Sequence, residues 1–231
     1  MLNKIMDMHN HTTWSDGAHE AEELIENAIN QGVGIIGISD HYDTIKCNSI
    51  PASMLKEYIQ SLEEIKDKYK GKIKVLSGIE ICMNQEWCHL YNLRFDILNR
   101  LDYVLFEYVD YFPDSVTIKE MKEYTSKITC KKGLAHTNLF SLGEKYGLEN
   151  VIKDLKDNDL FWEINVNPGY KYFDNIIVNK ETTPVVELFN KLKEYDIKIT
   201  VGSDTHSLRF YDIERIRVGN LLANYNPERF K

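Results

Sequence analysis

Residues 34–41 read GIIGISDH, a short run of isoleucine and glycine that ends in an acid and a histidine. Such a run, rich in β-branched side chains and bounded by polar residues, is typical of a buried β-strand. The strand would present Asp40 and His41 at its carboxyl end. If the pattern recurs along the chain, it predicts parallel strands whose polar ends meet in one place.

The pattern does recur, and the apolar runs alternate with segments of helical periodicity. The expected strands are residues 5–8, 33–38, 73–79, 103–106, 133–135, 160–164 and 197–201. The expected helices are residues 20–30, 52–69, 90–99, 118–130, 148–157, 184–195 and 213–223. Strands that alternate with helices indicate a parallel sheet with right-handed crossovers.

Two architectures fit these strand–helix units: an open doubly wound sheet and a closed barrel with fewer than eight strands. An open sheet commonly binds nucleotides through a glycine-rich first loop. The first loop here, HNHTTWSDG at residues 9–17, contains one glycine and no GxGxxG motif. We therefore expect an α/β fold of the distorted TIM-like (β/α)7 barrel type, with parallel strands, in a single domain over residues 1–231.

The composition is that of an ordinary globular protein, with 43% hydrophobic and 28% charged residues. A net charge of −8 argues against stable binding to nucleic acids or to anionic membranes. The sequence shows no membrane-spanning segment and no signal peptide. The four cysteines form no CxxC pair, so we expect a cytoplasmic protein with reduced thiols.

Side chains that can bind a metal ion stand at or just beyond the carboxyl end of every expected strand. In chain order they are His9 and His11, Asp40 and His41, Glu80, Glu107, His136, Glu163 and Asn165, and Asp204 and His206. The carboxyl ends of barrel strands converge on one face, where active sites of this architecture lie. Histidines and carboxylates without cysteine provide the nitrogen and oxygen ligands that Zn, Mn or Fe accept.

Each of these residues also has a plainer interpretation. Glu80 could be a buried acid satisfied by backbone donors, Asp40 a helix cap, and His136 a core histidine. Burying so many charges without a cation is costly, however, and this favours the metal site. Of the two remaining histidines, His19 is expected at the surface and His89 is not expected to be a ligand.

Five segments in order resemble the motif series of the PHP family (polymerase and histidinol phosphatase): DMHNHTTWSDG, GISDH, SGIE, GLAHT and GSDTH. They extend over residues 7–206. The resemblance implies a distorted barrel of seven strand–helix units, in agreement with the periodicity. It also implies metal-dependent hydrolysis of phosphoesters, which in this family include histidinol phosphate, nucleotides and DNA ends.

The resemblance further implies how two or three divalent ions would be held. A first ion would be bound by His9, His11, Glu80 and Asp204. A second would be bound by Glu80 and His136, with Glu80 bridging the two ions. A third would lie near Asp16, His41 and His206.

The sequence departs from the family pattern at several positions. Similar sequences commonly carry a histidine just after the fourth strand, but here the segment is LDYVLFEYVD, with Glu107 as the nearest replacement ligand. Exchanging an imidazole for a carboxylate predicts a second ion that is held differently. Thr137 stands where proline is usual, and Asp16 precedes Gly17, where some members carry a histidine.

The implied reaction is attack on phosphorus by a metal-bridged hydroxide. Glu80 would hold both ions, and Asp204 or His206 would assist as acid or base. Arg209 and Lys171 are candidates to bind the phosphate, and Asn165 is a candidate to orient the substrate or a ligand. Residues 167–179 are expected to form a loop, either a lid over the substrate or a packed surface loop.

The leading interpretation is a metal-dependent phosphoesterase that hydrolyses a small phosphomonoester similar to histidinol phosphate. A nucleotide phosphatase or nuclease of the same family is an alternative, although the acidic chain has no obvious basic track. A non-catalytic metal-binding member of the family is another. A metal-dependent amidohydrolase on a similar barrel is also conceivable, but the SDG and GSDTH segments fit the PHP pattern better.

Overall fold

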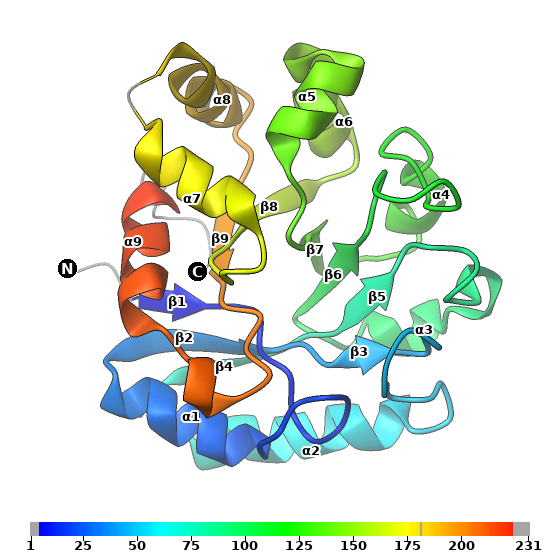
Figure 1. Ribbon diagram of the computed structural model, residues 1–231. Helices are drawn as coiled ribbons and strands as arrows, with labels where there is room; N and C mark the ends of the chain where they lie inside the picture. Colours follow the sequence, from blue (N-terminus) through cyan, green and yellow to red (C-terminus); the bar gives the residue numbers. More distant parts are fainter. Residues whose placement is uncertain (1–4, 181, 224–231) are drawn as a thin grey trace.

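The computed structural model describes residues 5–180 and 182–223. Parallel strands occupy the middle of the molecule and helices surround them (Figure 1). The strands are β1 (Ile5–Asp7), β2 (Val33–Ile38), β3 (His41–Tyr42), β4 (Lys74–Ser77), β5 (Glu80–Cys82), β6 (Tyr103–Glu107), β7 (Lys131–Leu134), β8 (Leu160–Asn165) and β9 (Ile199–Gly202).

Two of the strands resume after a short break beyond the expected ranges, so that β2 is followed by β3 and β4 is followed by β5. The hydrogen-bonded sheets are β1-β2-β4 and β3-β5-β6-β7-β8-β9. The ladder runs on across the breaks, because Gly78 N donates to Ile38 O (2.7 Å) and Glu80 N donates to Asp40 O (3.0 Å). The nine described strands therefore fill seven positions in one ring, as the sequence pattern predicts.

Backbone hydrogen bonds between the chain beyond β1 and the last strand close this ring. Met8 N donates to Val201 O at 2.7 Å, and His11 N donates to Thr205 O at 2.9 Å. The prediction of a TIM-like α/β barrel of parallel strands is thus confirmed.

A buried carboxylate strengthens the same seam. Asp7, at the end of β1, accepts hydrogen bonds from Ser203 N and Ser203 Oγ, both at 2.8 Å. Burial raises the pKa of Asp7 to about 6, although the hydrogen bonds from Ser203 oppose the shift. A polar contact inside the protein therefore joins β1 to the residue that directly follows β9.

Side chains alternate between the two faces of each strand, and this alternation sets what the barrel interior contains. In β6 the residues Tyr103 and Glu107 share the inward face, and in β8 so do Phe161 and Glu163. A separate apolar cluster fills the inside: Met8, Ile35, Leu76, Tyr103, Leu105, Ala135 and Phe161. The interior is therefore apolar at its amino end and charged at its carboxyl end.

Helices cover the outer face of the strands. They are α1 (Ala21–Asn30), α2 (Leu55–Lys68), α3 (Phe95–Leu98), α4 (Lys122–Thr125), α5 (Leu139–Tyr146), α6 (Leu148–Asp157), α7 (Lys171–Val178), α8 (Thr183–Glu194) and α9 (Ile213–Ala223), with 3-10 helices η1 (Leu90–Asn92) and η2 (Leu208–Phe210). Within the described ranges, none of them is both long enough and apolar enough to cross a bilayer.

Three segments differ from the sequence expectations. Residues 90–99 form η1 and α3 instead of one helix, and residues 118–130 contain only the single turn α4. Ile118 and Met121 are buried all the same, so the apolar spacing there reflects burial in an irregular backbone. The expected loop 167–179 contains the helix α7, which begins directly after Pro168, Gly169 and Tyr170.

We predict that Gly133→Ala lowers the free energy of unfolding by about 1–3 kcal/mol. A Cβ at Gly133 would overlap the ring of Phe161, which is packed inside the barrel, so ring or strand must move. Urea unfolding followed by circular dichroism measures the effect.

Gly143→Ala, within α5, is the matched control, because its Cβ would make ordinary contacts at 3.6 Å. Alanine in a helix should leave stability unchanged or raise it by about 0.5–1 kcal/mol. Equal stability of the Gly133→Ala variant and the wild type would contradict the described packing of Phe161.

Candidate metal centre

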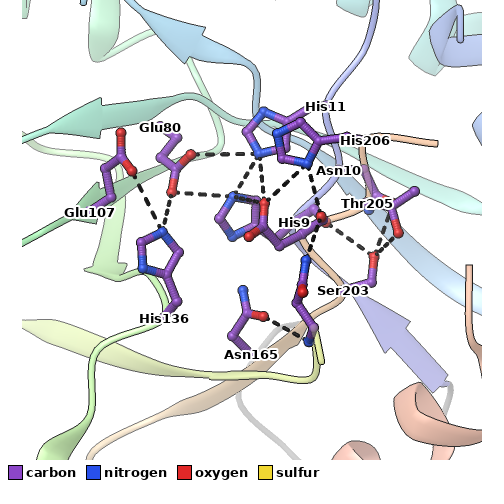
Figure 2. A network of polar contacts seen from close by, with 12 residues as sticks. His9, Asn10, His11, Glu80, Glu107, His136, Asn165, Ser203, Thr205 and His206 are labelled. Carbon is purple, nitrogen blue, oxygen red and sulfur yellow. Dashed lines mark hydrogen bonds and ion pairs between the residues drawn. The ribbon is translucent and has the colours of Figure 1, made fainter. Parts of the chain in front are cut away.

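The side chains predicted as ligands meet at the carboxyl end of the barrel. Figure 2 shows His9, His11, Glu80, Glu107, His136 and His206 among them. They follow or end different strands, so their meeting depends on the closed ring. The residues brought together are His9, His11, Asp16, His41, Glu80, Glu107, His136, Asp204 and His206.

The first group of ligand atoms lies at the centre. His9 Nε2 lies 3.0 Å from His11 Nε2 and 3.3 Å from Glu80 Oε1. Asp204 Oδ1 lies 3.1 Å from His11 Nε2 and 3.6 Å from His9 Nε2. These four residues are the set that the resemblance implied for a first ion.

The electrostatics of this group favour a positive charge at its centre. Burial lowers the pKa of His9, but the carboxylates around it, with Glu80 first, raise that pKa well above its ordinary value. Burial raises the pKa of Glu80, and His9 and His41 lower it well below its ordinary value. The pKa of His11 falls to about 3 because of burial and the nearby His41.

A second group lies nearer the surface. His206 Nε2 is 3.2 Å from Asp16 Oδ1, and His41 Nε2 is 3.7 Å from Asp16 Oδ2. The side chain of His206 is 38% exposed and that of Asp16 is 28% exposed, whereas His11 is fully buried. Burial raises the pKa of Asp16, but His206 and His41 outweigh it and hold that pKa below its usual range.

A third group surrounds Glu107. His136 Nε2 lies 3.2 Å from Glu80 Oε1 and 3.6 Å from Glu107 Oε2. Glu107 Oε1 lies 3.6 Å from His41 Nδ1. Both Glu107 oxygens also accept hydrogen bonds from Lys46 Nζ, at 2.9 and 2.7 Å.

Unpaired polar atoms in the interior show that the centre fits a metal ion. His11 Nδ1 and Glu80 Oε2 are buried without a hydrogen-bond partner among the described residues. His41 Nδ1 lies only 2.9 Å from Glu80 Oε2, but the two atoms do not have hydrogen-bond geometry. Unpaired buried polar atoms are costly, and a divalent cation would satisfy them. The nitrogen and oxygen donors fit Zn, Mn or Fe.

Glu163 positions two of the candidate ligands. Its Oε1 accepts a hydrogen bond from His9 Nδ1 (2.8 Å), and its Oε2 accepts one from His136 N (2.7 Å). A carboxylate on the far nitrogen of a ligand histidine fixes the tautomer and the ring orientation. The sequence placed Glu163 at a strand end but did not indicate this role, which requires contact between residues far apart in the chain.

Asn165 supports Glu163. Its Nδ2 donates to Glu163 Oε2 at 3.1 Å, and its Oδ1 accepts from Asn167 N at 2.9 Å. The side chain therefore lies beside the centre, as its spacing from Glu163 predicts. Its direct contact with a substrate stays a prediction.

Asp40 fixes the first loop and does not face the ligand atoms. It accepts hydrogen bonds from Ser15 Oγ (2.7 Å), Thr12 N (2.7 Å) and Thr12 Oγ1 (2.9 Å). Burial raises its pKa, and these hydrogen bonds oppose the shift. Asp40 thereby holds in place the loop that presents Asp16.

Two of the candidate ligands have an uncommon backbone conformation. His136 has φ 32° and Asp204 has φ 52°, in the left-handed region that non-glycine residues seldom adopt. Both residues lie just after the end of a strand, β7 or β9. Their backbone conformation changes the direction of the chain at the point where their side chains face the centre. Such conformations cluster at functional sites, where the surrounding contacts hold them.

The remaining candidates lie outside the cluster of ligand atoms. Arg209 and Lys171 are exposed, and the guanidinium of Arg209 lies 5.5 Å from the ring centre of its neighbour Phe210. Their binding to phosphate stays a prediction. His89 is exposed and His19 lies 3.6 Å from the carboxylate of Glu23, and neither belongs to the groups of candidate ligand atoms.

The start of α7 covers part of the centre. The ring of Tyr170 stacks on His136 with 4.5 Å between the ring centres and 6° between the planes. The segment 167–179 therefore reaches the site, although it does so as the end of a helix and not as the expected loop.

Comparison with known sequences gives one family and one relative. The PHP domain model matches residues 7–226. The DNA polymerase/3'-5' exonuclease PolX of Bacillus subtilis is 25% identical over 215 residues, which is 89% of this chain and 35% of the polymerase. The chain therefore spans about a third of that relative's length.

Histidinol phosphatases are among the solved structures with similar folds. Histidinol phosphate phosphatase from Lactococcus lactis, complexed with Zn, L-histidinol and phosphate, has a TM-score of 0.65 and 20% identity, over 96% of this chain and 93% of that chain. The putative histidinol phosphatase from Listeria monocytogenes has a TM-score of 0.61 and 16% identity, over 88% of this chain and 96% of that chain. At these identities the likeness concerns the fold.

We predict that Glu163→Gln weakens the affinity for Mn²⁺ by about 10–100-fold while the fold is retained. Glutamine loses the negative charge that fixes the Nδ1 proton of His9, and its NH₂ group cannot accept from His136 N. Competition with a fluorescent chelator measures the affinity, and circular dichroism checks the fold.

The control is Glu149→Gln, which removes a carboxylate beside Lys191, away from the centre. It should leave the affinity for Mn²⁺ unchanged. An affinity within about twofold of the wild type in the Glu163→Gln variant would show that Glu163 does not position His9.

Proposed function

The chain belongs to the PHP domain family, and we propose that it is a metal-dependent phosphoesterase acting on a small phosphomonoester. The observation that carries the proposal is the convergence of histidines and carboxylates at the carboxyl end of the barrel, where three groups of candidate ligands adjoin.

Two or three divalent ions, Zn, Mn or Fe, would be bound there. His9, His11, Glu80 and Asp204 would hold one ion, and Asp16, His41 and His206 would hold another. His136 with Glu80 would hold the remaining one. Bound ions would supply a water of lowered pKa as nucleophile and would neutralise charge on the phosphoryl oxygens.

His206 is a candidate acid for the leaving group as long as its Nε2 holds no ion, because a metal-bound nitrogen carries no proton. It is the most exposed of the candidate ligands, and its Nδ1 donates to Asp204 O at 3.1 Å. Burial lowers the pKa of His206, but Asp16 outweighs it and raises that pKa, which favours the protonated imidazole. In the form without an ion on Nε2, the proton on this nitrogen would pass to the departing alkoxide oxygen as the P–O bond breaks. Asp204 is less free for this role because His9 and His11 surround its carboxylate.

A substrate similar to histidinol phosphate is supported by a solved structure of similar fold and by the side chains around the centre. The phosphatase from Lactococcus lactis binds Zn, L-histidinol and phosphate on a similar barrel. Arg209 and Lys171 are the candidates to contact the phosphate, and both are exposed. The aromatic rings of Tyr108 and Tyr170, which flank His136, offer surfaces for a planar leaving group.

The relative PolX favours one second candidate, a nuclease or nucleotide phosphatase. The net charge of −8 argues against it, because polynucleotide binding depends strongly on cationic contacts with phosphates.

We predict that His9→Ala and Asp204→Ala each lower phosphate release by more than about 10³-fold, with the fold retained, since each removes a central ligand. Treatment with a chelator should abolish turnover, and Mn²⁺ or Zn²⁺ should restore it in the wild type. His89→Ala, which removes an exposed histidine, should keep full activity. Unchanged turnover in the His9→Ala variant would refute the site assignment.

A substrate panel separates the two candidate functions. We expect kcat/KM for histidinol phosphate to exceed that for nucleoside monophosphates and for single-stranded DNA by at least about tenfold. Phosphate release and oligonucleotide cleavage are measured on the same Mn²⁺-loaded sample. Faster cleavage of DNA would make the nuclease the correct function.

A further inference from the structure

The Glu107 side of the centre already contains a cation that belongs to the chain. Lys46 Nζ donates to both Glu107 oxygens, at 2.9 and 2.7 Å. The Glu107 side chain is fully buried, and that of Lys46 is 20% exposed. Hydrogen bonds between charged groups are strong, and removing one partner of a buried pair is costly.

The loop that carries Lys46 is held in place by hydrogen bonds. Ile45 N donates to Trp87 O at 2.9 Å, and Lys46 N donates to Thr44 Oγ1 at 3.2 Å. Thr44 Oγ1 in turn donates to Trp87 O at 3.0 Å. Lys46 Nζ lies 4.8 Å from the centre of the Tyr108 ring, which adds a cation–π contact. The ammonium group is therefore positioned by several contacts and not by Glu107 alone.

A metal ion at the same carboxylate would compete with Lys46. Glu107 lies 3.6 Å from both His41 Nδ1 and His136 Nε2, so an ion between them would use Glu107 as a ligand. Metal–oxygen distances are about 2.0–2.2 Å, and the ammonium lies 2.7–2.9 Å from the same oxygens. The two cations would then lie within about 5 Å of each other. At this distance in a buried site they repel strongly.

We propose that the ammonium group of Lys46 takes the place of a divalent ion beside Glu107, so that the chain binds two divalent ions, at the other two groups. Lys46 is then a specificity-determining residue for metal stoichiometry. Glu107 serves as its counter-ion and not as the ligand that the sequence predicted. This inference rests on the proposed function, because it concerns the same centre.

Metal stoichiometry tests the proposal directly. The wild type (residues 1–231) and its variants are stripped with chelator, saturated with Mn²⁺ by equilibrium dialysis, and measured for Mn per chain. We expect two ions in the wild type and in Lys46→Arg, which keeps the positive charge. We expect three in Lys46→Met, because Glu107 is then free to bind metal. Lys145→Met, which removes the exposed partner of Asp110, is the matched control and should keep two.

A second variant covers the case in which Lys46→Met does not fold, since it leaves Glu107 unpaired. Glu107→Gln removes the carboxylate and should still bind two ions, because Glu107 is not a ligand in the wild type. Three ions in the wild type, two in folded Lys46→Met, or the loss of one ion in Glu107→Gln would each overturn the inference.

Phosphate release on the same samples distinguishes this inference from the proposed function. Two ions in the wild type without turnover on any phosphoester would refute the phosphoesterase and leave the role of Lys46 standing. Three ions with turnover would refute only the role of Lys46. A wild type that binds no ion would overturn both.

Discussion

Two hydrogen bonds from Ser203 to the buried Asp7 carboxylate fasten the first strand to the last, and the metal centre depends on this seam. His9 and His11 follow the first strand and Asp204 follows the last, so the 3.1 Å contact of His11 with Asp204 joins residues 193 positions apart. Only a closed ring brings them together. Backbone bonds contribute to the closure, but Asp7 acts where the two strands lead directly into the ligands. The position of Asp7 at this seam explains why an acid is buried there, although burial raises the pKa of Asp7.

The distribution of buried charge explains which carboxylates are available for metal. The inward face of the barrel becomes polar toward the carboxyl ends of the strands, and acids gather there. Glu163 is occupied by His9 and by the backbone of His136, and Glu107 is occupied by Lys46. Glu80 and Asp204 have histidine nitrogens around them and, within residues 5–180 and 182–223, no ion pair with a lysine or arginine. The buried carboxylates thus have three roles: Glu163 supports histidines, Glu107 pairs with a lysine, and Glu80 and Asp204 are candidate metal ligands. The partner of each carboxylate determines its role.

Much of the fold and the convergence of most of the candidate ligands could be predicted from the sequence, for physical reasons. Strands buried on both faces are continuous apolar runs, and a polar residue ending such a run must lie at the rim of the barrel. The rest depends on contacts between distant residues. The spacing of Ile118 and Met121 is helical, but the backbone around them is mostly irregular. Neither the pairing of Lys46 with Glu107 nor the support of His9 by Glu163 leaves a local pattern, because 61 and 154 positions separate the partners.

The gradient of exposure across the centre has a consequence for how fast bound ions exchange with solvent. His206 and Asp16 are 38% and 28% exposed, whereas His9 and His11 are fully buried and Glu80 nearly so. If the proposed ions are bound, an ion at the outer group would exchange directly with water, while an ion at the buried inner group would exchange more slowly. The inner position would then keep its metal for longer, and the outer position would take up the metal of the surrounding solution. Preparations of the same sequence will then differ in metal composition according to their history, even at equal occupancy.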